Sequence, residues 1–277
     1  MIRLALRVRR ADAEIVLAEL LGLVPAGVEE RDVDAGVVEY AVYGAPGELP
    51  ALPDLRAAAG GALVDVVTTE VADDWADRWR EFHAPVTVGG RVHVRAPWHP
   101  EASAEVAPVE VVIDPGQAFG TGAHATTRLC LEALCELEVP SPPAPLIDVG
   151  CGSGVLAVAA ARLGWAPVLG IDHERESVQA TLDNAAANGV ALQARRHDLL
   201  RDGPAPGAPV VLANLLRPLL LRVAEDGFAG GAPEVLVASG LLVHEGDEVA
   251  AAFGRHGLRE ADRRRDGDWI ALLLRTS

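Results

Sequence analysis

The sequence predicts an α/β protein in which a large domain with a mostly parallel sheet follows a smaller α+β domain. Half of the 277 residues are hydrophobic, which is enough for a sizeable core. From residue 146 onward, short apolar runs alternate with helical stretches, as they do where helices connect parallel strands. We therefore expect a leading domain over residues 1–70, a connecting segment with one helix and short strands over 71–98, and a main domain over 99–277.

In the leading domain we expect each helix to be preceded and followed by a strand along the chain. Apolar and polar residues alternate from Ile2 to Val8, as in a half-buried strand, and Asp34-Ala35-Gly36 is a hairpin turn. The expected elements are a strand over 2–8, a helix over 13–21, strands over 26–31 and 37–43, a weaker helix over 51–59 and a strand over 62–70. This order is that of a ferredoxin-like α+β fold. No histidine or cysteine occurs in it, so substrate recognition or stabilisation are its available roles.

The connecting segment carries an aromatic stripe. Trp75, Trp79 and Phe82 recur at the spacing of one helix face, in a stretch that is helical by propensity. A helix that docks its apolar side on a domain is the favoured interpretation, and a surface that touches a substrate protein is the alternative. Short strands then run from Pro85 to Pro97 into the main domain.

The main domain is organised around a strand, a glycine loop and a helix. Residues 146–149 form an apolar run, glycines follow at 150, 152 and 154, and a strongly helical stretch then ends at Gly164. Such a unit brings a cofactor against backbone N–H groups at a helix N-terminus. A second short strand ends in Asp172, 22 positions after Gly150, which is where a ribose-binding carboxylate is expected.

The spacing within the loop favours one of two cofactor classes. A dinucleotide fingerprint would have glycine or alanine at the position of Val155, whereas this chain has an acid, Asp148, one spacer and then Gly-x-Gly-x-Gly. That pattern resembles the first motif of class I S-adenosylmethionine-dependent methyltransferases. The resemblance implies a Rossmann-like domain whose seven-stranded sheet is mostly parallel with a final antiparallel strand. It also implies that the loop faces the methionine part of the cofactor and that Asp172 binds both ribose hydroxyls. A dinucleotide enzyme and a coincidental turn are the alternatives.

The remaining elements complete a domain of this kind. Asp198 follows the strand 193–197, where the adenine edge lies in that class, and an ordinary turn aspartate is the equally weighted alternative. Asn214 closes an apolar strand, which places it on the carboxyl edge of the sheet, where α/β folds bind ligands. The other expected elements are strands over 110–114, 168–172 and 235–239, helices over 126–134, 177–188, 219–224 and 245–256, and a hairpin of 258–264 with 269–275 across Asp266-Gly267.

The stretch from Gln117 to Leu129 is rich in small polar residues and precedes the first helix of the main domain. Two glycines flank Thr121, which is typical of a mobile loop, so we expect a lid here. Thr126-Thr127 can cap the helix that follows. His124 could be a base, a ligand or a structural hydrogen-bonding group, and the last is the favoured interpretation.

Four motifs that occur in one order narrow the resemblance. They are Asp73-Asp74-Trp75 with Trp79, the loop from Ala118 to Thr127, the glycine motif from Asp148 to Gly154, and Ala213-Asn214-Leu215-Leu216. Together they resemble the PrmA family, the bacterial methyltransferases that modify ribosomal protein L11, over essentially the whole chain. The resemblance implies that the leading domain holds the substrate and that S-adenosylmethionine is the methyl donor.

The resemblance also assigns site residues. The implied cofactor-binding residues are Thr127, Gly150, Gly152, Asp172, Asp198 and Asn214. We expect Asn214 to be catalytic as well, because its carbonyl oxygen could accept a hydrogen bond from the incoming amine or from the amino group of the cofactor. Ala123, Ala125 and His173-Glu174 depart from the usual family pattern without removing any of these contacts.

Composition limits the partners. A net charge of −16 argues against nucleic-acid binding and suits a basic protein substrate such as L11, although acidity that only maintains solubility is an equal alternative. The three cysteines form no Cys-x-x-Cys pair, which favours a reduced, cytoplasmic protein without a metal site. No apolar run is long enough for a membrane span, and we expect a monomer. A methyltransferase for another protein or a small amine, and a non-catalytic ribosome-assembly factor, are the competing functions.

Overall fold

The chain forms two compact units, which we describe separately. Contacts in the computed structural model divide it into residues 1–82 and 83–277. The structure describes residues 2–13, 16–17, 20, 28–34, 36–44, 49, 52–70, 84–101, 109–114 and 122–276. The predicted stripe of Trp75, Trp79 and Phe82 and residues 117–121 of the predicted lid therefore lie outside the described residues.

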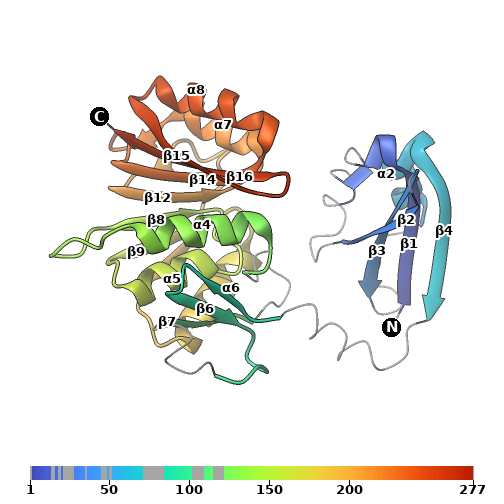
Figure 1. Ribbon diagram of the computed structural model, residues 1–277, viewed down its shortest axis with the longest axis horizontal. Coiled ribbons are helices and arrows are strands. Elements are labelled where there is room, and N and C mark those ends of the chain that lie inside the picture. The colour runs from blue at the N-terminus through green and yellow to red at the C-terminus, as the bar shows by residue number, and fades with distance from the viewer. Residues whose placement is uncertain are drawn as a thin grey trace. The chain divides into compact units, whose positions relative to one another are not determined.

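The first unit contains a four-stranded antiparallel sheet in the order β2-β3-β1-β4 (Figure 1). Its elements are β1 (Ile2–Arg9), η1 (Arg10–Asp12), β2 (Glu29–Asp34), β3 (Val37–Gly44), α2 (Leu52–Ala59), η2 (Gly60–Ala62) and β4 (Leu63–Glu70). Alternate side chains of β1 and β3 are buried together with Leu20 and Leu55, as the period-two pattern predicts. The predicted helix over 13–21 lies partly outside the described residues.

The opposite face of this sheet is held by ion pairs. Glu39 is buried and accepts hydrogen bonds from Arg3 at 2.6 Å and from Arg7 at 2.8 Å, and Arg31 lies 3.1 Å away. Burial alone would raise the pKa of Glu39, but the hydrogen bonds from the two arginines outweigh it and lower that pKa. The small unit is thus an α+β sheet with one apolar and one charged face.

The second unit is built on a seven-stranded sheet in the order β10-β9-β8-β12-β14-β16-β15. The first five strands are parallel, and β16 pairs antiparallel with both β14 and β15, so the predicted fold class is confirmed. The strands are β8 (Leu146–Val149), β9 (Val168–Asp172), β10 (Gln193–Arg196), β12 (Val210–Asn214), β14 (Val235–Leu242), β15 (Leu258–Asp266) and β16 (Trp269–Thr276). Charged residues cover most of the edge strand β15, which protects it from pairing with other chains.

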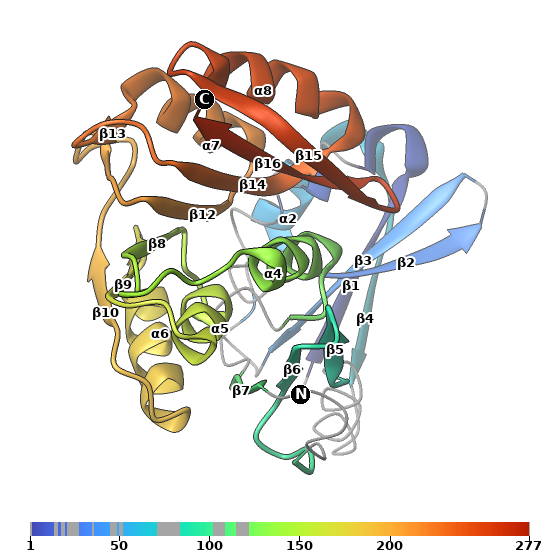
Figure 2. The same ribbon diagram turned by 60° about the vertical axis from the view of Figure 1, so that its left-hand side comes forward.

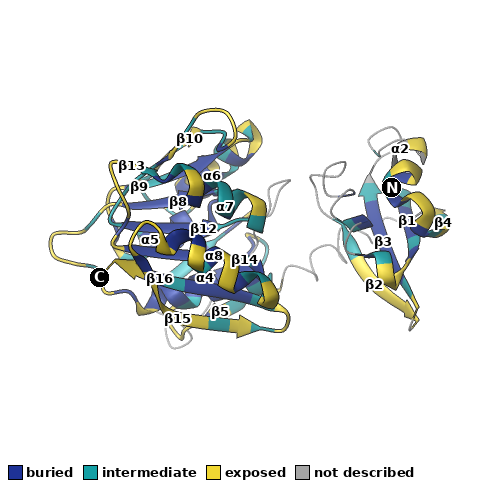
Figure 3. Ribbon diagram, turned by 90° about the horizontal axis from the view of Figure 1, so that it is seen from above, coloured by how far each residue is buried: buried dark blue, intermediate teal, exposed yellow. Residues whose placement is uncertain are grey.

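Helices cover both faces of this sheet (Figures 1 and 2). One face is covered by α4 (Ala125–Glu136), α5 (Val155–Leu163) and α6 (Arg175–Ala187), and the other by α7 (Arg217–Asp226) and α8 (Gly246–Gly254), which η3 (Val243–Glu245) precedes. Alternate residues of a strand face the two layers: Leu212 packs towards α4, whereas Val211 and Ala213 pack towards α7. The central strands are accordingly buried on both faces (Figure 3).

A second, three-stranded sheet packs beside α4 and α5. Its strands are β5 (Val86–Val88), β6 (Val92–Arg95) and β7 (Val109–Val112), and a two-stranded ladder joins β11 (Ala205–Pro206) to β13 (Phe228–Ala229). The sequence placed residues 84–98 in a connecting segment, whereas β5 and β6 belong by their contacts to the second unit. A strand of three or four residues has the same sequence pattern whether it connects two domains or packs against one of them.

Among the described residues, no helix is long and apolar enough to cross a membrane.

Candidate cofactor-binding and active site

Three of the sequence-predicted site residues lie at one level of the sheet edge. Val149 pairs with Ile171 on one side and with Ala213 on the other. Gly150, Asp172 and Asn214 each follow one of these residues, so the register brings all three to the carboxyl ends of adjacent parallel strands. That edge is where α/β folds bind ligands.

The glycine loop has a backbone that other residues could not adopt without strain. Gly150 has φ +76°, and a Cβ atom there would lie 2.4 Å from Leu215 Cδ2. Gly154 has φ +82°, and a Cβ atom there would lie 2.9 Å from the Cα of Thr181 in α6. The glycines therefore let the loop turn left-handed between two close neighbours, and α5 begins directly after it.

Asp172 closes one side of the loop. Its Oδ2 accepts a hydrogen bond from Gly152 N–H and its Oδ1 accepts one from Glu174 N–H, both at 3.0 Å. The side chain is only 9% exposed. His173 Nδ1 also lies 3.3 Å from Oδ1. A carboxylate has about four acceptor positions, so the two backbone hydrogen bonds do not exhaust those of Asp172, and Oδ2 has room for a hydroxyl donor.

Asn214 and Thr127 meet, although they are 87 residues apart in the chain. Asn214 Nδ2 donates to Thr127 Oγ1 at 3.4 Å, at the long end of the hydrogen-bond range. Thr127 is buried in the first turn of α4. Because Nδ2 is directed at Thr127, Oδ1 on the other branch of the planar amide is directed away from Thr127.

His124 caps α4. Its Nδ1 accepts a hydrogen bond from Thr126 N–H, and its ring packs edge-on against Trp269 with 5.2 Å between the ring centroids. The sequence placed the cap on Thr126-Thr127, but these residues are inside the helix. Burial lowers the pKa of His124, and the nearby charge of Arg128 lowers it further, which favours the neutral ring that the cap requires. The structural interpretation of His124 therefore agrees with its position.

Asp198 lies in a turn beyond β10. Its Oδ1 accepts a hydrogen bond from Leu200 N–H at 2.9 Å, and its Oδ2 lies 3.5 Å from Arg201 Nε. His197 N–H donates to Asp172 O, which places this turn beside the end of β9. The geometry is that of a turn-forming aspartate, and a role at the adenine edge stays a prediction.

Asp148 is fully buried beneath the loop. Its Oδ2 accepts a hydrogen bond from Ala157 N–H at 3.1 Å, whereas its Oδ1 is a buried atom without a hydrogen-bond partner among the described residues. Burial raises the pKa of Asp148 to about 7, and the charge of Asp172 adds to the effect.

Three residues that shape the loop are not among the predicted site residues. Leu215 lies over Gly150, while Thr181 and Asn184 of α6 bind the carbonyl groups of Gly152 and Ser153. A signal was present for the last two, because polar residues recur at helical spacing on the buried side of α6. Leu215 belongs to the motif Ala213-Asn214-Leu215-Leu216, but that motif did not indicate its contact with Gly150, which depends on the register of two strands.

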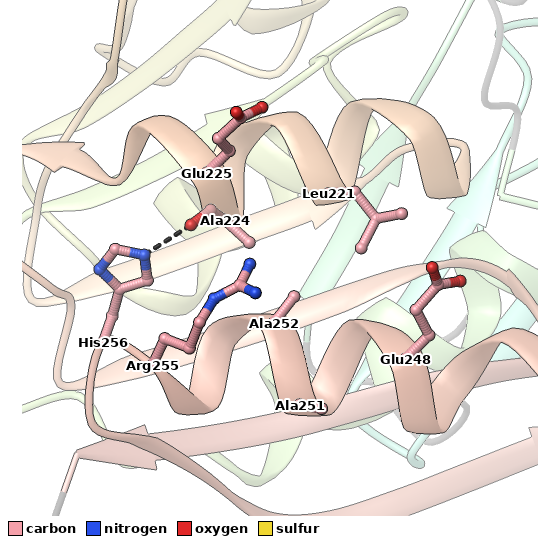
Figure 4. A pocket seen from close by; sticks show the side chains of 8 residues that line it. All are labelled: Leu221, Ala224, Glu225, Glu248, Ala251, Ala252, Arg255 and His256. Carbon is pink, nitrogen blue, oxygen red and sulfur yellow. Dashed lines mark hydrogen bonds between the residues drawn. The ribbon is translucent and has the colours of Figure 1, made fainter.

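A groove between α7 and α8 is separate from this site (Figure 4). His256 Nε2 donates to Ala224 O at 2.5 Å across it. Its lining residues are Leu221, Ala224, Glu225, Glu248, Ala251, Ala252, Arg255 and His256. It includes none of the predicted site residues. Within the described part of the chain, no cluster of three or more histidine, cysteine or acidic side chains is suited to a metal ion.

Comparisons with known proteins agree on one family. The family described as ribosomal protein L11 methyltransferase (PrmA) matches residues 55–277. The ribosomal protein L11 methyltransferase of Syntrophotalea carbinolica is 43% identical over 216 residues, which cover 76% of this chain and 70% of that protein. The enzyme of the same name from Bordetella bronchiseptica is 35% identical, and the alignment covers 97% of each chain. A crystal structure of the ribosomal protein L11 methylase from Lactobacillus delbrueckii subsp. bulgaricus has a TM-score of 0.61 and 27% identity, and covers 70% of this chain and 99% of that chain.

Proposed function

The chain belongs to the ribosomal protein L11 methyltransferase (PrmA) family, and from this membership we propose that it transfers methyl groups from S-adenosylmethionine to amines of ribosomal protein L11. The observation that carries the proposal is the placing of Gly150, Asp172 and Asn214 at one level of the sheet edge. We propose lysine side chains, and the N-terminal amine as well, as the groups that accept methyl.

The residues at the sheet edge fit this cofactor. S-adenosylmethionine supplies a methyl group on a positively charged sulfur, so the electrophile belongs to the cofactor. Backbone groups of Gly150 and Gly152 would bind its methionine part, and the carboxylate of Asp172 would receive the ribose hydroxyls. Asp198 would lie at the adenine edge. Thr127 and Asn214 would lie at the end where the methyl group is transferred.

The chain must also accept an uncharged amine. A lysine with a pKa of about 10.4 is protonated at neutral pH, and its neutral form costs about 5 kcal/mol there. A site that removes water from the amine lowers this cost. Asn214 Oδ1 supplies an acceptor that orients the amine, and Thr127 holds the amide group that carries it. No side-chain nucleophile is required, and His124 serves as a helix cap.

The partner, oligomeric state and compartment follow from the same reasoning. The net charge of −16 would steer a basic protein towards the enzyme and disfavour nucleic acid. The leading unit is the candidate surface for holding the substrate protein. We propose a monomeric enzyme that acts in the cytoplasm.

Binding and transfer can be tested in two steps. Calorimetry with S-adenosylmethionine and with NAD identifies the cofactor, and binding of NAD alone would refute the proposal. Incubation with radiolabelled S-adenosylmethionine and purified ribosomal protein L11, followed by mass spectrometry, then locates the methyl groups. All 24 basic residues of this chain are arginine, so label on a lysine must come from the partner.

Two other functions give different outcomes in that assay. A methyltransferase for another protein or a small amine would bind S-adenosylmethionine and leave L11 unlabelled. A non-catalytic assembly factor would bind L11 and transfer nothing. Methylated lysines in L11, formed only when the enzyme is present, distinguish the proposed function from both.

A further inference from the structure

Helix α6 presents polar side chains to the glycine loop, where a helix covering a sheet ordinarily presents apolar ones. Ser177, Thr181 and Asn184 are buried at the spacing of one helix face, and Asn188 continues that face by one turn. A buried amide or hydroxyl destabilises a fold unless its hydrogen bonds are satisfied. Ser177 Oγ donates to Glu174 Oε2 at the start of the helix, so the partners of Thr181 and Asn184 are the ones that indicate a role at the loop.

Thr181 and Asn184 bind two consecutive carbonyl groups of the loop. Thr181 Oγ1 lies within donating distance of Gly152 O, at 3.1 Å, and of Cys151 Sγ, at 3.2 Å, with the carbonyl oxygen the stronger acceptor. Asn184 Nδ2 donates to Ser153 O at 2.8 Å. Because peptide groups are planar and trans, the N–H that follows each carbonyl points the opposite way. The N–H groups of Ser153 and Gly154 are therefore directed away from α6, and that of Gly154 closes the turn onto Cys151 O at 2.7 Å.

Asn184 also binds a second segment. Its Oδ1 accepts a hydrogen bond from Asp114 N–H at 2.9 Å, and its Nδ2 lies 3.4 Å from Asp114 O. Asp114 is two residues beyond the end of β7. One amide with 3% exposure thus joins the glycine loop to the chain after β7, and each of its hydrogen-bonding groups is used.

We propose that Asn184 and Thr181 are positioning residues of the cofactor site, which hold the glycine loop in the conformation that binds S-adenosylmethionine. The inference rests on the proposed function, because it assumes that the loop binds this cofactor. Neither side chain needs to touch the ligand. Their effect passes through the carbonyl groups of Gly152 and Ser153.

Asn188, the C-cap residue of α6, provides a matched control. Its side chain makes the same kind of clamp with β7, accepting from Val112 N–H at 2.8 Å and donating to Val112 O at 2.6 Å. Its other hydrogen bond goes to Asn184 O at 2.7 Å, so its side chain stabilises the packing of α6 without binding the loop. Thr181→Ser provides a second control, since it keeps the hydroxyl group that Thr181→Val removes.

The test measures the Kd of S-adenosylhomocysteine by calorimetry on the full-length chain, together with the Tm of each ligand-free variant. Loss of one hydrogen bond to the loop should raise Kd about fivefold in Asn184→Ser and in Thr181→Val. Asn188→Ser and Thr181→Ser should keep Kd within about twofold of wild type, even where Asn188→Ser lowers Tm as much as Asn184→Ser does.

Two results would overturn the inference. One is an unchanged Kd in both Thr181→Val and Asn184→Ser, and the other is an equal rise in Asn188→Ser, which would show a role in helix packing alone. If Asn184→Ser does not fold, the two Thr181 variants decide the matter. A wild-type chain that binds no S-adenosylhomocysteine would instead refute the proposed function, and the inference with it.

Discussion

The carboxylate of Asp172 is bound to the glycine loop itself, because Asp172 Oδ2 accepts a hydrogen bond from Gly152 N–H at 3.0 Å. The two residues are 20 positions apart. Gly152 lies in the loop after β8 and Asp172 ends the adjacent strand β9, so this contact links the ends of the two strands. An acid that binds the cofactor would therefore also help to hold the loop that receives it. Replacing Asp172 therefore acts on cofactor binding both directly and through the loop, and the two effects need separate controls.

Replacement of Asp172 should weaken cofactor binding. Asp172→Ala removes a charged acceptor for two hydroxyl groups, and hydrogen bonds to a charged group contribute about 1.5–3 kcal/mol, so Kd should rise at least about tenfold. Calorimetry with S-adenosylmethionine measures this, and the Tm reports any damage to the loop. Asp183→Ala, which removes an exposed acid of α6, is the control. An unchanged Kd in Asp172→Ala would exclude the ribose contact.

The pair of Asn214 and Thr127 should affect turnover together. Asn214→Ala removes the acceptor for the amine and should lower kcat at least about tenfold, which corresponds to about 1.4 kcal/mol. Thr127→Val keeps the shape of the side chain but loses the oxygen that holds Asn214, so a smaller decrease is expected. Because the residues are in contact, the double variant should lose less than the sum of the two single effects. Full turnover by Asn214→Ala, with normal cofactor affinity, would contradict the catalytic role.

An added methyl group at Gly150 should disturb the loop in two ways. Gly150→Ala strains a residue with φ +76°. It also places the new Cβ atom 2.4 Å from Leu215 Cδ2, so the side chain of Leu215 must shift. We expect a loss of stability of about 1–2 kcal/mol from the left-handed backbone and a rise in cofactor Kd. Gly189→Ala is the control, since Gly189 has φ +63° with nothing within 4 Å of the added Cβ. Equal effects of the two variants on Kd would show that the contact with Leu215 does not matter.

Asp148 should make stability depend on pH. Burial raises its pKa to about 7, from 3.8 for the unfolded chain. Between these values the unfolded chain releases a proton that the folded protein keeps, so this group lowers the free energy of unfolding by up to about 1.4 kcal/mol for each unit of rising pH. Asp148→Asn has no titrating group at this position and keeps an oxygen that can accept the hydrogen bond from Ala157 N–H. Its stability relative to wild type should therefore increase up to about pH 7 and then level off. Urea unfolding of both proteins across this range measures the difference, and a constant difference would contradict the raised pKa.

His124 should have the opposite pH dependence. Burial lowers the pKa of His124 in the folded protein below its ordinary value of 6.5. As the pH falls, the unfolded chain therefore binds a proton at His124 before the folded protein does. The stability that the neutral cap contributes is lost over that range. His124→Ala should lower the free energy of unfolding by about 1 kcal/mol at pH 8, and His124→Ser, which can still cap the helix, by less. The advantage of wild type over His124→Ser should shrink on acidification from pH 8 to pH 6. Thermal unfolding at both pH values measures it, and an advantage that grows at pH 6 would rule out the neutral cap.

Much of the main domain could be predicted because its signals are local. Gly150, Gly152 and Gly154 follow an apolar strand and precede a helix former, and each of these features can be seen within a few residues. Asp172 follows at a spacing that one helix and one strand determine. The hairpin at Gly267 was predicted in the same way, and β15 and β16 pair across it.

Contacts between distant residues could not be predicted in this way. Thr126 and Thr127 are good capping residues by type, yet the neighbouring His124 caps α4 while its ring packs on Trp269. In the sequence Asn184 resembles an ordinary helix residue. Only the fold shows that its amide donates to Ser153 O and accepts from Asp114 N–H. In both cases the choice of partner depends on which segments the fold brings together.

The amino-acid sequence alone determined the α/β class, the position of the glycine loop and the motifs of the family, since these depend on residue types at short, regular spacings. The tertiary structure decided which side chains act on that loop: Leu215 above Gly150, Asp172 against Gly152, and Thr181 and Asn184 behind the carbonyl groups. The physical reason is that a hydrogen bond or a close contact forms over a few ångströms. Strand register and helix packing set those distances between residues that are far apart in the chain.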